Sequence, residues 1–563
     1  MGLGKRDREF RLPKISYVDF KHLEMDRVLT AFFMRLAHNG FLGRLNRRFE
    51  LTVESFTEEF LGHPEWFSGF GLHRDVLERW VETHLLDVVN RGKRNQAVAA
   101  PRPLHGFTYR FRNPKHSRDY GAAQHIYEML YGARHGSGEN ALDHLKSFFF
   151  QGHDRVTGLP SSDATLDVET QALLRLLDQV EDAPDTRTGR ESVPPLCVGA
   201  ADLLAEDVQR LLFYQDRIPR SVMVEYLKIL LSFHLAIYHL RLLKLLPALV
   251  KRQGGDPLCD PSSCPMNPRS VDDPHGGCPY RVQLLVDVGG VADGAVSNLA
   301  ERSADTHYRR IPAFVKAYFG TRKLDEFAGD LARRGKLNRP TSGQFAVGEV
   351  LQLLGAPHRE ERERFFGQRI YGLIQDARTE DDDLDPELKA VAEMSLSEFD
   401  AYIEMLVAVR GSFHRRYIIE CLDSLLMKNR PGALLAQGRT KKAPRRFVLD
   451  SRLLEVLLQI AVLQPGGALG YYTGELRIDE LLTLLRERYG LHIDQLPQGD
   501  GFGEPTIADR KALRENQKAF VSRLREIGFY RDLSDAYVTQ TVTPRYRIAK
   551  TEKMPAGEEG AVK

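Results

Sequence analysis

The chain has 563 residues, of which 42% are hydrophobic and 28% are charged, and its net charge at pH 7 is +2. This composition is typical of a globular protein with several domains. It excludes a polycation, so any DNA-binding surface must come from local segregation of charge. The five cysteines, an odd number in a long chain, argue against a secreted disulfide framework and for a reducing, cytoplasmic environment.

The first part of the chain is predicted to be mainly helical. Six apolar residues between Met25 and Leu36 follow the spacing of one helical face. Further helices are predicted over residues 74–89 and 166–180. Between them, His105, Phe107, Tyr109 and Phe111 alternate with polar residues, which predicts a strand over residues 105–112. We assign residues 1–180 to an N-terminal helical domain.

Residues 181–195 are rich in charge and proline and are interpreted as a linker. A central helical domain is predicted over residues 196–380. Its longest helix covers residues 221–246 and is expected to stop near Pro247, because proline cannot continue the hydrogen-bond ladder. The most apolar stretch of the chain, residues 229–240, lies in this helix. It is too short to span a bilayer, so we expect a buried core helix and no membrane association.

A helical connector with a basic segment is predicted over residues 386–445, where Ser395 and Glu398 have the spacing of a capping box. Three helices (residues 451–463, 479–489 and 507–527) and two strands (529–533 and 537–548) then follow. This order predicts a winged helix-turn-helix-like domain over residues 446–548. Residues 549–563 are expected to be a disordered tail. The predicted fold is therefore mainly α and multi-domain.

A loop in the central domain has the composition of a metal site. Its pattern is Cys259-x4-Cys264-x10-His275-x2-Cys278, in a stretch rich in proline and glycine. Zinc prefers four thiolate or imidazole ligands in a tetrahedron, and a site with four protein ligands is structural. The alternative is a loop with unpaired thiols, since the spacing differs from standard zinc-finger spacings.

A first basic segment, residues 88–118, contains no acidic residue. Arg110 and Arg112 alternate there with aromatic residues. Basic groups neutralise phosphates and aromatic rings stack on bases, so this segment is a candidate nucleic-acid surface. The alternative is a solvated basic face over a strand whose aromatic residues fill the core.

A second basic segment, residues 424–449, also lacks acids and leads into the predicted winged helix. Its third helix should place apolar residues on one face and basic residues on others, as a recognition helix requires. The alternative is a protein-docking module, because winged helices also serve that role. The candidate DNA-binding residues of this part of the chain are Lys441, Lys442, Arg445, Arg446, Lys511, Arg514, Lys518, Arg545 and Arg547.

Signals for catalysis are weak in this sequence. Asp163, Asp167 and Glu169 could form the acidic cluster of a nuclease, but acids at a helix start are expected from the helix dipole alone. The segment LLVDVGG is a short glycine loop of the kind found in actin-like kinases, and no Walker loop accompanies it. We therefore expect no enzymatic activity and assign no catalytic residue.

Three segments of the sequence carry a resemblance to a known group of proteins. They are SYVDFKHLEMDRVLTAFFMRLA, CPYRVQLLVDVGG and RFVLDSRLLEVLLQIAVL. With them the chain resembles accessory proteins of bacterial anti-phage defence islands, above all the component of unknown activity in the methylation-associated defence system. It is also similar to subunits of phosphorothioation-dependent restriction systems. The resemblance implies a role beside a methyltransferase, a kinase-like or ATPase subunit and a restriction effector, and it carries over no active-site residues.

These observations favour a non-enzymatic, DNA-associated subunit of a defence complex, with other subunits and DNA as partners. A protein scaffold without DNA contact and a divergent metal-dependent nuclease are the alternatives. Basic segments that converge on one face would favour the first function, and buried, converging acids would favour the nuclease.

Overall fold

The computed structural model describes residues 4–47, 50–65, 67–134, 136–152, 166–175, 177, 180–187, 192–255, 259, 264, 278–377, 386–440, 442–530 and 541–551. Helices predominate in these residues, which confirms the mainly α class. The chain divides into two compact units. Unit 1 comprises residues 1–205, 234–280 and 308–425, and unit 2 comprises residues 206–233, 281–307 and 426–563.

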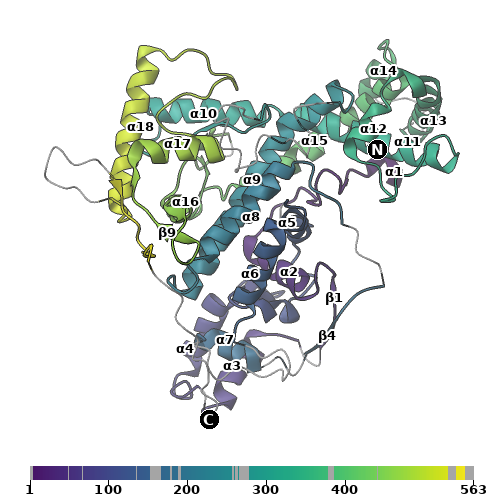
Figure 1. Cartoon of the computed structure of the whole chain (residues 1–563). Helices are drawn as coiled ribbons and strands as arrows, with labels where there is room; N and C mark the ends of the chain where they lie inside the picture. Colours follow the sequence, from purple (N-terminus) through teal and green to yellow (C-terminus); the bar gives the residue numbers. More distant parts are fainter. Residues whose placement is uncertain are drawn as a thin grey trace. The chain divides into compact units, whose positions relative to one another are not determined.

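Unit 1 is a helical unit with two small antiparallel ladders (Figure 1). Its helices are α1 (Lys5–Arg8), α2 (Met25–Ala37), α3 (Val53–Gly62), α4 (Arg74–Trp80), α5 (Ala122–Tyr131), α6 (Ser137–Phe149), α7 (Val168–Arg175), α11 (Ile311–Arg333), α12 (Val347–Gln352), α13 (Arg359–Ala377), α14 (Pro386–Ala392) and α15 (Glu398–Leu425). Strand β1 (Gly43–Arg47) pairs with β4 (Val180–Pro184), and β2 (Leu86–Val89) pairs with β3 (Ala97–Pro101).

The apolar periodicity of the first helix is confirmed. Helix α2 buries the predicted face, with Phe32 and Phe33 fully buried. Helix α15 begins later than expected: the Ser397 hydroxyl accepts a hydrogen bond from the Asp400 backbone N–H at 3.1 Å, so the cap lies two residues beyond Ser395. The residues interpreted as a linker begin with strand β4, because their backbone groups pair with β1.

Unit 2 contains helices α10 (Ala295–Tyr308), α16 (Ser451–Ala461), α17 (Ile478–Tyr489) and α18 (Ile507–Glu526). Its short strands form four ladders. Strand β5 (Leu284–Leu285) pairs in parallel with β11 (Leu491–His492). Three ladders are antiparallel: β6 (Leu435–Gln437) with β7 (Arg445–Phe447), β8 (Leu463–Pro465) with β9 (Tyr471–Thr473), and β10 (Leu476–Arg477) with β12 (Thr541–Val542).

The three helices predicted near the C-terminus are confirmed as α16, α17 and α18. Of the two strands predicted after them, residues 531–540 lie outside the described part of the chain. The ends that are described are paired: Tyr530 forms an antiparallel bridge with Val542, and the Thr543 N–H donates to the Phe529 carbonyl oxygen at 2.8 Å. Val542 also pairs with Leu476 of β10.

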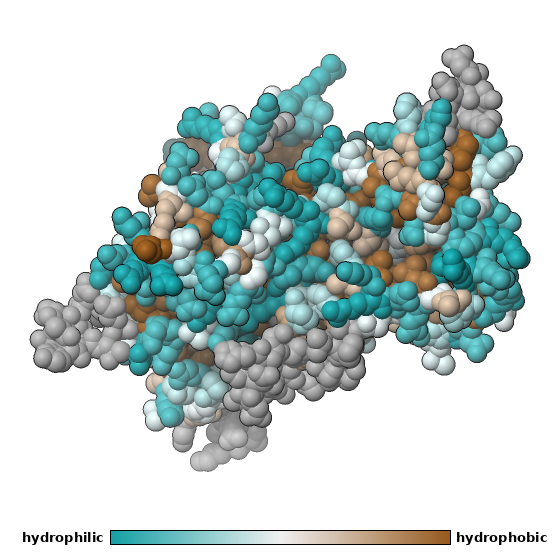
Figure 2. All heavy atoms as spheres, turned by 90° about the horizontal axis from the view of Figure 1, so that it is seen from above, coloured by the Kyte–Doolittle hydropathy of each residue, from teal (hydrophilic) through white to brown (hydrophobic). Residues whose placement is uncertain are grey.

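Two long helices, α8 (Val198–Leu212) and α9 (Arg220–Lys251), contribute residues to both units. Helix α9 runs through Pro247, so the predicted stop at this residue is wrong. A proline removes only one N–H of the ladder, and the helix ends four residues later. Among the described residues, α9 alone is long and apolar enough to cross a membrane, but 94% of its apolar window is buried inside the protein. Figure 2 shows one face of the molecule, on which hydrophilic residues predominate and hydrophobic ones form scattered patches.

Candidate nucleic-acid interface

Helix α18 separates a buried face from a basic face. It begins at Thr506, whose hydroxyl accepts from the Asp509 N–H at 3.2 Å while the Asp509 carboxylate accepts from the Thr506 N–H at 2.9 Å. This capping box satisfies two of the N–H groups that a helix start leaves unpaired. Its buried residues are Ala512, Leu513, Asn516, Phe520 and Leu524, and its exposed basic residues are Arg510, Lys511, Arg514, Lys518 and Arg525.

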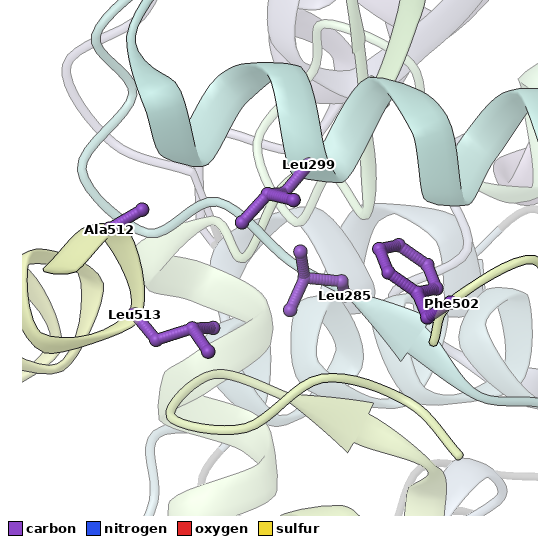
Figure 3. Close-up of a cluster of buried hydrophobic side chains, with 5 residues drawn as sticks. All are labelled: Leu285, Leu299, Phe502, Ala512 and Leu513. Atoms are coloured by element: carbon purple, nitrogen blue, oxygen red, sulfur yellow. The ribbon is translucent and has the colours of Figure 1, made fainter. Parts of the chain in front are cut away.

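The buried face of α18 packs on a compact apolar cluster of unit 2 (Figure 3). Leu285 of β5 lies among Leu299 of α10, Phe502 of the loop before α18, and the α18 residues Ala512 and Leu513. Each of these five residues is at most 8% exposed. Burial of apolar side chains is the main favourable term in folding, so this cluster holds α18 against the rest of unit 2.

Asn516 fixes the position of α18 more specifically than the apolar contacts do. Its side chain is 1% exposed, and its Nδ2 donates to the carbonyl oxygens of Val286 and Ile493 at 2.9 Å each. Its Oδ1 accepts from the Val288 N–H at 2.9 Å. A buried amide is costly unless its hydrogen bonds are made, and here both N–H groups and the oxygen are used. This arrangement sets the rotation of α18 and therefore which residues reach solvent.

Helix α17 is anchored in unit 2 by a buried ion pair. The Arg488 guanidinium contacts the carboxylate of Asp207, which is fully buried, and lies 3.3 Å from Glu206. The Tyr489 hydroxyl donates to the other Asp207 oxygen at 2.9 Å. Burial lowers the pKa of Arg488, but the nearby Asp207 and Glu206 outweigh it and raise this pKa well above its usual value. The pair therefore stays charged and fixes the end of α17.

A close approach of two backbones follows directly at Gly490. This residue ends α17 with φ of +73°, in the left-handed region that favours glycine. A side chain added there would collide with the carbonyl oxygen of Val282. The glycine thus allows β11 to pair with β5, and the segment CPYRVQLLVDVGG has a structural role in supporting α17 and α18.

The predicted DNA-binding residues near the C-terminus are placed in three ways. Lys511, Arg514 and Lys518 are exposed along α18, and Lys442 and Arg547 are exposed elsewhere in unit 2. The Arg545 side chain is 47% exposed and lies 3.7 Å from Glu455. Lys441 lies outside the described residues, and Arg445 is half-buried.

Arg446 differs from these residues because it is used inside unit 2. It donates to the Ser297 hydroxyl at 2.9 Å and to the Gly290 carbonyl oxygen at 3.3 Å, and its guanidinium lies 3.9 Å from the Asp287 carboxylate. Its side chain is only 18% exposed. These contacts make Arg446 a brace for the loop after β5.

The first basic segment does not form the predicted strand. Residues 106–111 form a 3-10 helix, and Phe107, Tyr109 and Phe111 are buried. Arg110 pairs with Asp182 at 2.6 Å, and burial lowers the pKa of Arg112. The aromatic residues alternate because a buried turn turns nearly every side chain inward, so a period of two does not require a strand. Arg110 and Arg112 therefore contribute little free basic surface in unit 1.

The predicted acidic cluster lies at the start of α7. The Asp167 carboxylate accepts from the Thr170 N–H at 2.7 Å, which is the contact of a helix cap. Burial, together with the nearby Asp167, raises the pKa of Glu169. Asp163 lies outside the described residues. The geometry at Asp167 is explained by helix capping.

The predicted zinc loop is described only at its three cysteines. Cys259, Cys264 and Cys278 are half-buried, and His275 lies outside the described residues. Within the described part of the chain, no three His, Cys, Asp or Glu side chains stand together in a way that could hold a metal ion. The zinc site thus stays a prediction.

Sequence reasoning missed Asn516, Asp207 and Arg488. A polar residue within the apolar face of a predicted helix was the available signal for Asn516. The Asp207–Arg488 pair joins residues 281 positions apart, and nothing local in the sequence indicates it.

The chain matches the family model of the methylation-associated defense system protein MAD7 over residues 5–546. Neither a curated protein nor a solved structure matches it.

Proposed function

Because the chain belongs to the family of the methylation-associated defense system protein MAD7, we propose that it serves this system as a DNA-associated subunit without catalytic activity of its own. The observation that carries the proposal is the exposed basic stripe of α18, formed by Lys511, Arg514, Lys518 and Arg525. Membership in the system implies other components as partners, and we expect the protein to act with them on DNA in the cytoplasm.

We propose further that the C-terminal part of unit 2 is a winged helix. Its elements follow the order α16, β10, α17, α18, and the paired ends Tyr530 and Val542 come next. The pairing of β12 with β10 supports this assignment. In helix-turn-helix proteins the second helix of the motif enters the major groove, and α18 takes that place here.

A groove beside α18 supports contact with a nucleic-acid backbone. It has a volume of about 520 Å³ and is lined by Arg477, Ile478 and Asp479 at the start of α17 and by Gln517, Lys518, Val521 and Arg525 of α18. Three cations against one carboxylate leave a positive lining. Phosphate groups are drawn to such clusters and to helix N-termini.

Binding of duplex DNA by fluorescence anisotropy over a range of salt concentrations tests the proposal. Replacing Lys511, Arg514 and Lys518 by Gln should weaken binding about tenfold or more and should lower the salt slope by about three, since each lost phosphate contact removes about one released counterion. The matched control is Arg359→Gln, Arg364→Gln and Lys389→Gln, three exposed residues of unit 1 with the same total charge change. This control should bind as the wild type does.

Each outcome is decisive. Unchanged binding by the folded α18 variant, or an equal loss in the control, contradicts an interface on this helix. A wild-type protein that binds no DNA favours a protein scaffold in the same system. Metal-dependent cleavage of plasmid DNA that disappears in Asp167→Ala contradicts the non-catalytic role.

A further inference from the structure

Unit 1 contains a buried cation whose nearest partner is a thiol. Arg241 of α9 is 2% exposed, and its Nη1 donates to the Cys197 sulfur at 3.2 Å. Its Nε is buried and forms no hydrogen bond. Among the described residues no carboxylate pairs with this guanidinium. A buried arginine stays protonated and is unfavourable without a negative partner, so the structure around Arg241 calls for a source of negative charge.

Three sulfur atoms lie close enough to interact with this guanidinium. Burial lowers the pKa of Arg241, but electrostatic interaction with Cys197, Cys278 and Cys264 outweighs it and raises this pKa. Cys197 directly precedes α8, whereas Cys264 and Cys278 belong to the loop after α9. Three thiols from two distant segments therefore meet near one cation.

Neutral thiols are poor counter-charges, and an apolar environment favours the neutral form of a thiol. A divalent soft metal ion reverses this preference because it deprotonates the thiols that bind it. One dication with three or four thiolates carries a net negative charge. Such a centre would supply the charge that Arg241 lacks, and N–H donors to metal-bound ligands are the usual outer partners of metal sites.

We propose that Cys197, Cys264 and Cys278 are thiolate ligands of one zinc ion, and that Arg241 donates to the sulfur of Cys197 and balances the charge of the centre. Cys259, in the same loop, is the remaining thiol available for the fourth position. The described cysteines do not share a common centre as they stand, so zinc binding must draw the loop toward Cys197. A site closed by four protein ligands is structural, and this one would fasten the loop to the start of α8.

The test measures zinc in the full-length protein, purified without chelators, by elemental analysis. We expect about one zinc per chain in the wild type. Cys197→Ser should lose it. Cys421→Ser is the matched control, because Cys421 is a buried cysteine of α15 in the same unit, and it should keep the zinc. Arg241→Met should keep the ion but release it to a competing chelator with an affinity about tenfold lower or more.

A second variant covers the case in which Cys197→Ser does not fold. Cys197→His offers an alternative zinc ligand, and X-ray absorption should then count one sulfur fewer around the metal than in the wild type. A folded wild type without zinc, a Cys197→Ser protein with full zinc content, or an unchanged sulfur count in Cys197→His would each overturn the proposal.

Discussion

Asn516 donates a hydrogen bond of 2.9 Å to the backbone carbonyl oxygen of Val286, a residue 230 positions away in the sequence. The contact ties α18 to the loop after β5, and the same side chain also binds Val288 and Ile493. The exposed basic residues of α18 thus owe their direction to a buried polar residue on the opposite face.

Replacing Asn516 by Ala should lower the free energy of unfolding of unit 2 by roughly 2–4 kcal/mol, because one N–H and two carbonyl groups lose their partners in a buried site. Chemical denaturation of the full chain measures the change. Gln517→Ala is the control, since Gln517 is the exposed neighbouring amide on the same helix, and its effect should stay within about 0.5 kcal/mol. Equal effects of the two substitutions would mean that Asn516 does not position α18.

Replacing Arg488 by Met should destabilise unit 2 by about 3–5 kcal/mol, because it leaves the buried Asp207 carboxylate without its cation. Adding Asp207→Asn to this variant should restore part of the loss, since no uncompensated charge then remains. Arg477→Ala removes an exposed pair with Asp479 and should cost at most about 1 kcal/mol. Denaturation midpoints of the four proteins measure these differences. A double variant less stable than Arg488→Met alone would contradict the charge argument.

The sequence predicts the local features of this protein well. Periodicity located α2, α16, α17 and α18, and charge patterning located the exposed stripe of α18. Features that depend on distant partners were missed. Tertiary packing carries α9 through Pro247 and buries the aromatic residues near Arg110 in a 3-10 helix. The two units are discontinuous in the chain, so composition shifts along the sequence do not mark their limits.

The candidate sites divide in the same manner. The zinc-loop cysteines stand out by spacing alone, but Cys197 lies far from them in the sequence and has no motif around it. Its place beside Arg241 follows only from how α8 and α9 pack. Arg446 was predicted on charge alone, and its contact with Ser297 could not be read from a basic run.

Acidification should destabilise the protein through three buried histidines. Burial lowers the pKa of His239, His414 and His492 to about 4 each, from a value of 6.5 for an unburied histidine. Between these two values the unfolded chain binds protons that the folded chain does not. Stability should therefore fall as the pH drops from 6.5 towards 4, by up to about 1.4 kcal/mol per pH unit for each histidine, and should be independent of these groups above that window.

Denaturation at several pH values between 7.5 and 5 measures this dependence, and one substitution isolates a single histidine. Carboxylates also titrate on acidification, so the readout is the difference in slope between wild type and variant. His239→Gln should reduce the slope by about one proton in the window, even if the variant is less stable at every pH because the 3.0 Å contact with Ser16 is altered. His22→Gln is the control, because the His22 side chain is 54% exposed, and it should leave the slope unchanged. If His239→Gln keeps the wild-type slope, the ring of His239 takes up its proton in the folded protein as readily as in the unfolded chain, and its burial does not govern the acid sensitivity.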